Sequence, residues 1–201
     1  MVSRYLGFTL LMLITLSGAC RKLPTSTSGI VPASAGIPLA DGFAYPIGEK
    51  SRVTEARDGD GWYNAQDFGE NDHLAEDWNG EKGGNTDCGL PVYAAAKGVI
   101  VLAANVYGWG QVIIVRHRLS DGAEVETQYA HLQKMLKTSG TVERREKIGL
   151  VGDGDGRFLC HLHFELRTSD CPSWGATGVC YSQDHKGWTD PSDFIDRHRT
   201  K

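Results

Sequence analysis

The stretch His161-Leu162-His163-Phe164-Glu165-Leu166 decides how this chain folds and where its chemistry lies. Successive side chains of a β-strand point to opposite faces of a sheet, so the two histidines share one face. The apolar residues Leu162, Phe164 and Leu166 then point into a core on the other face. Two imidazoles above an apolar stripe suit a metal-bound water with a neighbouring base, but they equally suit a solvated strand face.

Other segments supply the further ligands that a hydrolytic metal site needs. His73 and Asp77 stand four positions apart, and His131 lies in the segment Tyr129-Ala130-His131-Leu132. Zinc in hydrolytic sites takes three nitrogen or oxygen ligands from the protein and keeps a fourth position for water. His73, Asp77 and one of the two strand histidines, His161 or His163, would fill that count. The two remaining histidines would then be available for proton transfer.

The N-terminal residues have the composition of an export signal. Arg4 supplies positive charge, residues 5–16 form a short apolar run, and small residues follow at 17–19. The run is too short to span a bilayer as a mature helix, so residues 1–19 are predicted to be a signal peptide that is removed. The segment 16–20 is similar to a bacterial lipobox, although its leucine stands one place too early. We therefore expect lipidation at Cys20, with ordinary signal-peptide cleavage and secretion as the alternative.

The remainder of the chain divides into a linker and one domain. Residues 20–40 carry the lipidation site and are rich in Pro, Ser, Thr, Gly and Ala, which predicts a flexible linker. Residues 41–201 are enough for one domain with a single core. A net charge of -4 and the lack of a basic run argue against nucleic acid as a partner. We expect an exported, periplasmic protein that Cys20 attaches to a membrane.

Strand-like patterns dominate the domain. Glycine accounts for 25 of 201 residues, above the usual ~7%, which fits many tight turns. Only two short helical turns are expected, over residues 132–137 and from Pro191 to Ile195. The predicted fold is all-β, with a mostly antiparallel, barrel-sandwich-like sheet core, a groove and few short helices. The predicted strands cover residues 90–95, 98–103, 111–116, 125–131, 147–151 and 161–166.

Four cysteines besides Cys20 suggest disulfides, because an exported chain meets an oxidising environment. Cys171 and Cys180 enclose a loop-like stretch and are the first predicted pair. Cys88 and Cys160 then form the second pair by elimination. A cysteine zinc site is disfavoured because the sequence contains no C-x-x-C motif.

Several other histidines and tryptophans need an interpretation. His117, His185 and His198 lie in polar surroundings and are expected at the surface. Trp78 and Trp109 lie close to the candidate ligands, so they are candidates for substrate contacts as well as for packing.

Four blocks, in this order and spacing, resemble the lysostaphin/LytM-type zinc metallopeptidases, which cleave peptide bonds in peptidoglycan. The likeness covers roughly residues 60 to 195. The blocks are residues 68–79 with H-x-x-x-D at His73 to Asp77, residues 89–100, Tyr129 to Leu132, and residues 148–165 ending in the H-x-H strand.

The resemblance implies a zinc-dependent endopeptidase with one Zn²⁺ per chain and peptidoglycan peptide stems as substrate. It implies that His73, Asp77 and His163 are the zinc ligands and that His131 and His161 are catalytic histidines that do not bind the metal. Glu165 is expected to have a structural or supporting part.

Inactive relatives that have lost ligands activate other hydrolases, and here all five positions are filled. The filled positions argue against that role, and a non-catalytic module that binds the wall or activates another wall hydrolase is kept as the alternative. A secreted peptidase directed at foreign proteins or walls is a third hypothesis.

Overall fold

The computed structural model describes residues 36–48, 61–177 and 185–199. The predicted signal peptide, Cys20 and Cys180 lie outside the described residues. In the described part, one short α-helix, α1 (Pro191–Arg197), and one 3-10 turn, η1 (Glu70–Asp72), accompany two β-sheets. None of the helices in these ranges has the length and apolar character needed to cross a bilayer.

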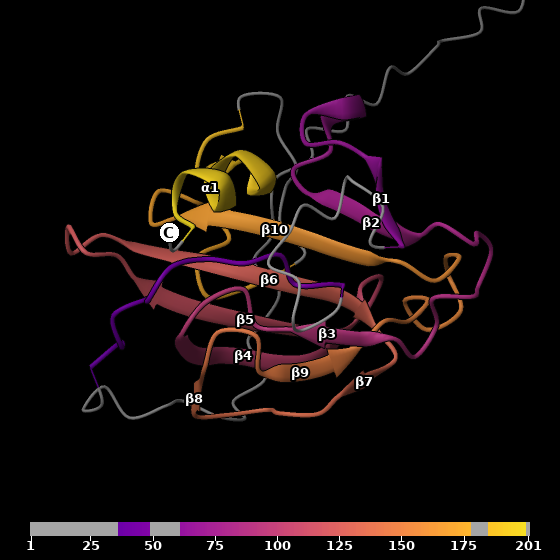
Figure 1. The fold of residues 1–201 in the computed structure, drawn as a ribbon, viewed down its shortest axis with the longest axis horizontal. Coiled ribbons are helices and arrows are strands. Elements are labelled where there is room, and N and C mark those ends of the chain that lie inside the picture. Colours follow the sequence, from indigo (N-terminus) through magenta and orange to yellow (C-terminus); the bar gives the residue numbers. More distant parts are fainter. Residues whose placement is uncertain (1–35, 49–60, 178–184, 200–201) are drawn as a thin grey trace, which may run out of the picture.

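The larger sheet is antiparallel and consists mostly of strands that follow one another in the sequence, but the strand of residues 162–168 lies between two segments that are distant from it in the sequence (Figure 1). Its strands, in spatial order, are β1 (Trp62–Gln66), β2 (Glu76–Gly80), β10 (Leu162–Thr168), β6 (Glu124–Leu132), β5 (Gly110–Arg118), β4 (Gly98–Val106) and β8 (Thr141–Val142), and β11 (Trp188–Thr189) pairs with β10. The smaller antiparallel sheet has the order β3 (Pro91–Tyr93), β9 (Lys147–Leu150) and β7 (Lys134–Met135).

The prediction of a mostly antiparallel all-β fold with few short helices is confirmed. Each predicted strand overlaps an observed one, and the helix predicted at Pro191 is α1. Proline at the first turn and the Asp190 side chain, which accepts a hydrogen bond from the Asp193 N–H at 2.9 Å, explain where α1 begins. The helical turn predicted over 132–137 is wrong, because Lys134 and Met135 pair with β9 as strand β7.

The main core lies between the two sheets. Leu162, Phe164 and Leu166 of β10 are fully buried in it, as the alternation predicted. They meet apolar residues of the smaller sheet, including Val92 and Ile148. His163 and Glu165 have the opposite strand parity, so they emerge on the face of the larger sheet that looks away from this core.

The strand register brings the candidate ligands together. His163 lies opposite Asp77 of β2 on one side and opposite Ala130 of β6 on the other. His131 follows Ala130 directly, and His161 immediately precedes β10, where it bridges to Gly152. Three neighbouring strands therefore deliver three of the five candidate residues to one end of the sheet.

The surface prediction for His117 is wrong. Its imidazole is fully buried on β5, where Nδ1 lies 2.9 Å from the Lys97 carbonyl oxygen and Nε2 lies 2.8 Å from Thr127 Oγ1. Burial lowers the pKa of His117 to about 4, so this histidine is a neutral core residue. His185 and His198 are half-buried, each beside a phenylalanine ring.

Candidate metal centre

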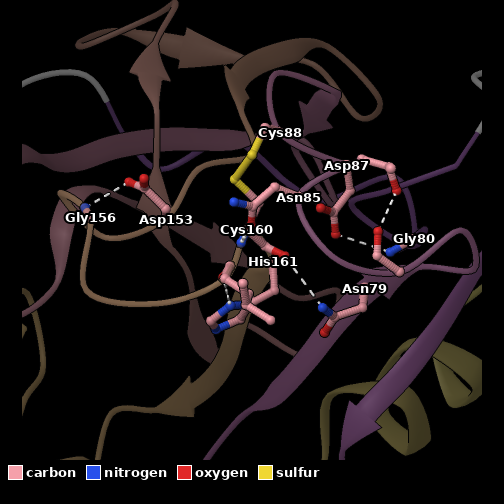
Figure 2. The surroundings of a disulfide bond; sticks show 12 residues. Asn79, Gly80, Asn85, Asp87, Cys88, Asp153, Gly156, Cys160 and His161 are labelled. Carbon is pink, nitrogen blue, oxygen red and sulfur yellow. Dashed lines mark hydrogen bonds between the residues drawn. A yellow bond between two sulfur atoms is a disulfide. The ribbon is translucent and has the colours of Figure 1, made fainter.

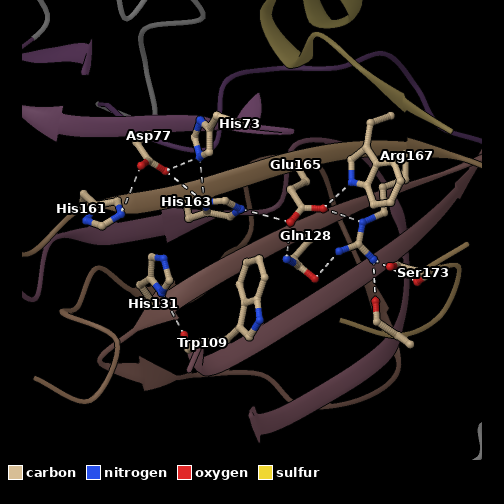
Figure 3. A network of polar contacts seen from close by, with 12 residues as sticks. His73, Asp77, Trp109, Gln128, His131, His161, His163, Glu165, Arg167 and Ser173 are labelled. Atoms are coloured by element: carbon tan, nitrogen blue, oxygen red, sulfur yellow. Dashed lines mark hydrogen bonds and ion pairs between the residues drawn. The ribbon is translucent and has the colours of Figure 1, made fainter. Parts of the chain in front are cut away.

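Three ligand atoms from β10, β2 and the segment before β2 converge on one point (Figure 3). His163 Nδ1 lies 3.0 Å from Asp77 Oδ1, and His73 Nε2 lies 3.3 Å from the same oxygen. The two nitrogens are themselves 3.3 Å apart. Each pair among the three atoms is therefore in close contact.

This arrangement fits one small cation better than it fits hydrogen bonds. The carboxylate oxygen carries no hydrogen when ionised, and a hydrogen on one nitrogen can point at only one of the other two atoms. Ligands about 2.0–2.1 Å from a tetrahedral zinc ion lie about 3.3 Å from one another. The observed spacing of 3.0–3.3 Å matches this value. His73, Asp77 and His163 have the donor set and the spacing of a zinc site.

The electrostatics of the cluster also favour positive charge. Burial opposes ionisation of Asp77, but hydrogen bonds from His163 and His73 outweigh it and hold the pKa of this carboxyl well below its usual range. Burial likewise disfavours a charged His163, yet Asp77 and Glu165 outweigh it and raise the pKa of His163 to about 9. Two carboxylates therefore flank a single imidazole.

The two other candidate histidines have matching hydrogen bonds. His131 Nδ1 lies 3.0 Å from the Trp109 carbonyl oxygen, and His161 Nδ1 lies 2.8 Å from the Leu159 carbonyl oxygen. Since a carbonyl only accepts, Nδ1 must carry the hydrogen in both rings, which leaves Nε2 with a lone pair in the neutral form. Burial and the imidazoles of His163 and His161 lower the pKa of His131 to about 3, so His131 is neutral.

All five candidate residues line one pocket of about 330 Å³. Trp109 stacks on the His131 ring with centroids 5.9 Å apart and meets the His163 ring edge-on at 5.1 Å. Trp109, a candidate for substrate contact or packing, therefore lines the pocket. Trp78 is fully buried and donates to Glu76 at 3.1 Å, so it packs in the core and does not line the pocket. The remaining lining residues are Gln66, Gly108 and Phe158.

Glu165 holds His163 from behind (Figure 3). Its Oε1 accepts from His163 Nε2 at 3.0 Å and from Gln128 Nε2 at 2.8 Å. Its Oε2 accepts from Arg167 Nε at 2.7 Å and from Trp188 Nε1 at 2.8 Å. Because His163 Nε2 carries the hydrogen in this bond, Nδ1 is the nitrogen left for a metal. Arg167 lowers the pKa of the buried Glu165 against the effect of burial and keeps it ionised.

A disulfide fixes the segment that carries His161 (Figure 2). Cys88 and Cys160 are bonded, with Cα atoms 5.3 Å apart. The Cys160 N–H donates to Asn85 at 2.9 Å, and Asn79 donates to the Cys160 carbonyl at 3.3 Å. The bridge therefore ties the residues just before His161 to the segment that follows β2.

Cys171 is buried and forms no disulfide within the described ranges. Its predicted partner, Cys180, lies outside them, so the Cys171–Cys180 pair stays a prediction.

Besides the lining residues Gln66 and Gly108, sequence reasoning missed four contributors to the site. Arg167 shares a strand face with Glu165, so strand parity alone could have found it. Gln128 lies opposite Glu165, which only the register of β6 and β10 reveals. Trp188 and Phe158 reach the site through β11 and a loop whose positions no local pattern indicates.

Comparison with known proteins gives a family match and several relatives. The profile of Peptidase family M23 matches residues 77–173. The DD-carboxypeptidase/endopeptidase Mpg of Neisseria meningitidis serogroup B is 39% identical over 84 residues, which cover 42% of this chain and 19% of that protein. The lipoprotein NlpD of Yersinia enterocolitica is 33% identical over 81 residues, which cover 39% of this chain and 78% of that protein.

Among solved structures, the SpoIIQ–SpoIIIAH pore-forming complex contains a similar chain, with a TM-score of 0.51 and 19% identity. The match covers 78% of this chain and 92% of that one, and it shows a shared fold. The chain thus matches only about a fifth of the length of Mpg but most of NlpD. The profile match and the similarity to NlpD, most of which this chain covers, show that the chain belongs to peptidase family M23.

Proposed function

We propose that this protein is a zinc-dependent endopeptidase that hydrolyses the peptide cross-links of peptidoglycan. The observation that carries the proposal is the convergence of His73, Asp77 and His163, with His131 and His161 beside them, around one pocket. Membership of family M23 and the name of the relative Mpg, a DD-carboxypeptidase/endopeptidase, support the choice of reaction and substrate.

The proposed ligands are His73 through Nε2, Asp77 through Oδ1 and His163 through Nδ1. A bound zinc ion would supply Lewis-acid polarisation of the scissile carbonyl and would lower the pKa of a coordinated water to roughly 7. Glu165 keeps the His163 ring in the orientation that directs Nδ1 at the other two ligands.

His131 and His161 are the proposed groups for proton transfer. Each donates its Nδ1 hydrogen to a backbone carbonyl, so each neutral ring has a basic Nε2. Their ring centroids are 4.8 Å apart, close enough for both to act on one scissile bond. In our proposal one accepts the proton of the attacking water, and the other hydrogen-bonds the oxyanion or protonates the departing amine.

We further propose that residues 1–19 are a signal peptide, that residues 20–40 form a linker lipidated at Cys20, and that residues 41–201 are the peptidase domain in the periplasm. Metabolic labelling with palmitate tests the anchor, since a Cys20→Ser variant should lose the label. Release of an unlabelled parent chain into the medium would favour the secreted alternative.

The enzymatic proposal is tested by incubating the purified chain and zinc with isolated sacculi. We expect soluble fragments with new amino termini, identified by mass spectrometry. The His131→Ala variant should retain one zinc per chain but release nothing, whereas His163→Ala should lose both zinc and activity. Binding to sacculi without new amino termini would instead support the alternative of a non-catalytic wall-binding or activating module.

A further inference from the structure

The loop between Gly152 and His161 presents an unusual set of exposed side chains. Phe158 is 45% exposed and Leu159 is 62% exposed, although both are large and apolar. Tyr107, which contacts the same loop, is 86% exposed. Exposed apolar side chains that gather beside a pocket indicate a binding surface more than single exposed residues do.

The loop is held in one conformation. The Asp153 carbonyl accepts from the N–H groups of Arg157 and Phe158, both at 3.0 Å, and Asp153 Oδ1 accepts from the Gly156 N–H at 2.9 Å (Figure 2). At the tip, Asn105 of β4 donates to Asp155 at 2.9 Å. The side chains at 157 and 158 are therefore positioned before any ligand arrives, which reduces the entropy that binding must overcome.

Phe158 forms one wall of the pocket. Its ring centroid lies 4.5 Å from that of His131 and 5.8 Å from that of His161. A peptide whose carbonyl lies between these two imidazoles would have the Phe158 ring beside it. The loop thus borders the path of the substrate.

Arg157 carries a cation that no carboxylate of the described residues neutralises. Its guanidinium carbon lies 4.6 Å from the centre of the Tyr107 ring, and no carboxylate of the described residues is within 4.0 Å of its nitrogens. By contrast, Arg116 and Arg167 pair with Glu126 and Glu165 at 2.7 Å. A guanidinium that stacks on an aromatic face keeps the N–H donors of its edge free for a bidentate carboxylate.

We propose that Arg157, held on Tyr107, is a subsite that binds a free carboxylate of the peptide substrate, with Phe158 packing against the peptide between this subsite and the metal centre. This inference rests on the proposed function for its substrate class. The occupant is a carboxylate-bearing peptide, because the loop offers a guanidinium with no carboxylate partner among the described residues beside the exposed apolar side chains of Phe158 and Leu159.

The test uses two synthetic cross-linked peptides that differ only in whether one carboxylate is free or amidated. For the free peptide, Arg157→Gln should raise KM about tenfold, the range of a charge-assisted hydrogen bond, with kcat changed less than twofold. For the amidated peptide, the parent and Arg157→Gln should have the same KM. Arg118→Gln is the matched control. Arg118 is exposed and is the last residue of β5, about 26 Å from Gly110 at the other end of this strand at ~3.3 Å per residue.

Binding to the His131→Ala variant separates this inference from the proposed function, because it needs no turnover. Fluorescence titration should show tighter binding of the free than of the amidated peptide, and adding Arg157→Gln should abolish the difference. If the parent hydrolyses neither peptide but this difference persists, the subsite stands and the enzymatic proposal fails. Equal losses on both peptides, or an equal effect of Arg118→Gln, would overturn the subsite.

Discussion

Replacing Glu165 by glutamine is the perturbation that most sharply probes how His163 is held. Four N–H donors converge on the two carboxylate oxygens, from His163 at 3.0 Å, Gln128 at 2.8 Å, Arg167 at 2.7 Å and Trp188 at 2.8 Å. Glutamine keeps the size of the side chain but exchanges one oxygen for an NH₂ group. Whichever way the amide is oriented, two of the four donors then face another donor.

The magnitude follows from these contacts. A buried donor left without an acceptor costs about 1–3 kcal/mol, and breaking a buried ion pair such as that of Glu165 with Arg167 costs about 3–5 kcal/mol. Arg167 keeps its bonds to Ser173 and Gln128, so these costs overlap. We expect Glu165→Gln to lower the free energy of unfolding by about 3–5 kcal/mol. Loss of the support behind His163 should weaken zinc binding about 10- to 100-fold.

Urea denaturation of the metal-free protein gives the first quantity, and competition for zinc with a chromophoric chelator gives the second. The matched control is Glu126→Gln, because Glu126 is also buried and pairs with Arg116 at 2.7 Å but touches none of the proposed ligands. This control should lose stability and keep its zinc affinity. If Glu165→Gln binds zinc as tightly as the parent, Glu165 does not position His163 and the reasoning fails.

Three further predictions concern residues around the core and the loop. Burial lowers the pKa of His117 from 6.5 to about 4, so between these pH values the unfolded chain binds a proton at His117 and the folded chain does not. The free energy of unfolding should therefore drop by about 3 kcal/mol as the pH falls from 6.5 to 4, and urea titrations of His117→Gln should lack this share of the decline. Replacing Cys88 and Cys160 by alanine should lower the free energy of unfolding by about 4 kcal/mol, since the bridge closes a long loop, and a thermal midpoint equal to that of the parent would contradict this. Gly154→Ala should reduce hydrolysis at unchanged zinc content, because Gly154 has a φ of 62° and an added Cβ would lie 2.7 Å from the Phe158 ring. Unchanged kinetics would show that the loop has room to adjust.

Much of the fold could be predicted because most of its strands have a recognisable apolar pattern in the local sequence. Alternation in residues 161–166 indicated both the core face and the histidine face, and both lie where that pattern requires. Strand β2 was missed since Glu76-Asp77-Trp78-Asn79-Gly80 is mostly polar and shows no apolar period. The backbone groups on the two edges of β2 pair with β1 and β10. The pairing with β10 joins segments far apart in the sequence, so a short stretch of sequence does not reveal it.

The supporting residues escaped prediction for a related reason. His117 reads as polar surface until Thr127 of the neighbouring strand and the Lys97 carbonyl satisfy its two nitrogens in the core. Phe158 reaches the pocket only because Gly154, Asp155 and Gly156 adopt positive φ angles in the preceding turn. Hydrogen-bond partners and turn geometry of this kind are set by the assembled fold, so they follow from the sequence only through the whole structure.

The most direct measurement of the central claim is a crystal structure of the zinc-loaded protein, with anomalous scattering recorded above and below the zinc absorption edge. We predict one anomalous peak per chain within about 2.0–2.2 Å of His73 Nε2, Asp77 Oδ1 and His163 Nδ1. No peak at this position under saturating zinc, or a zinc ion bound through His131 or His161 instead of His163, would contradict the proposed metal centre.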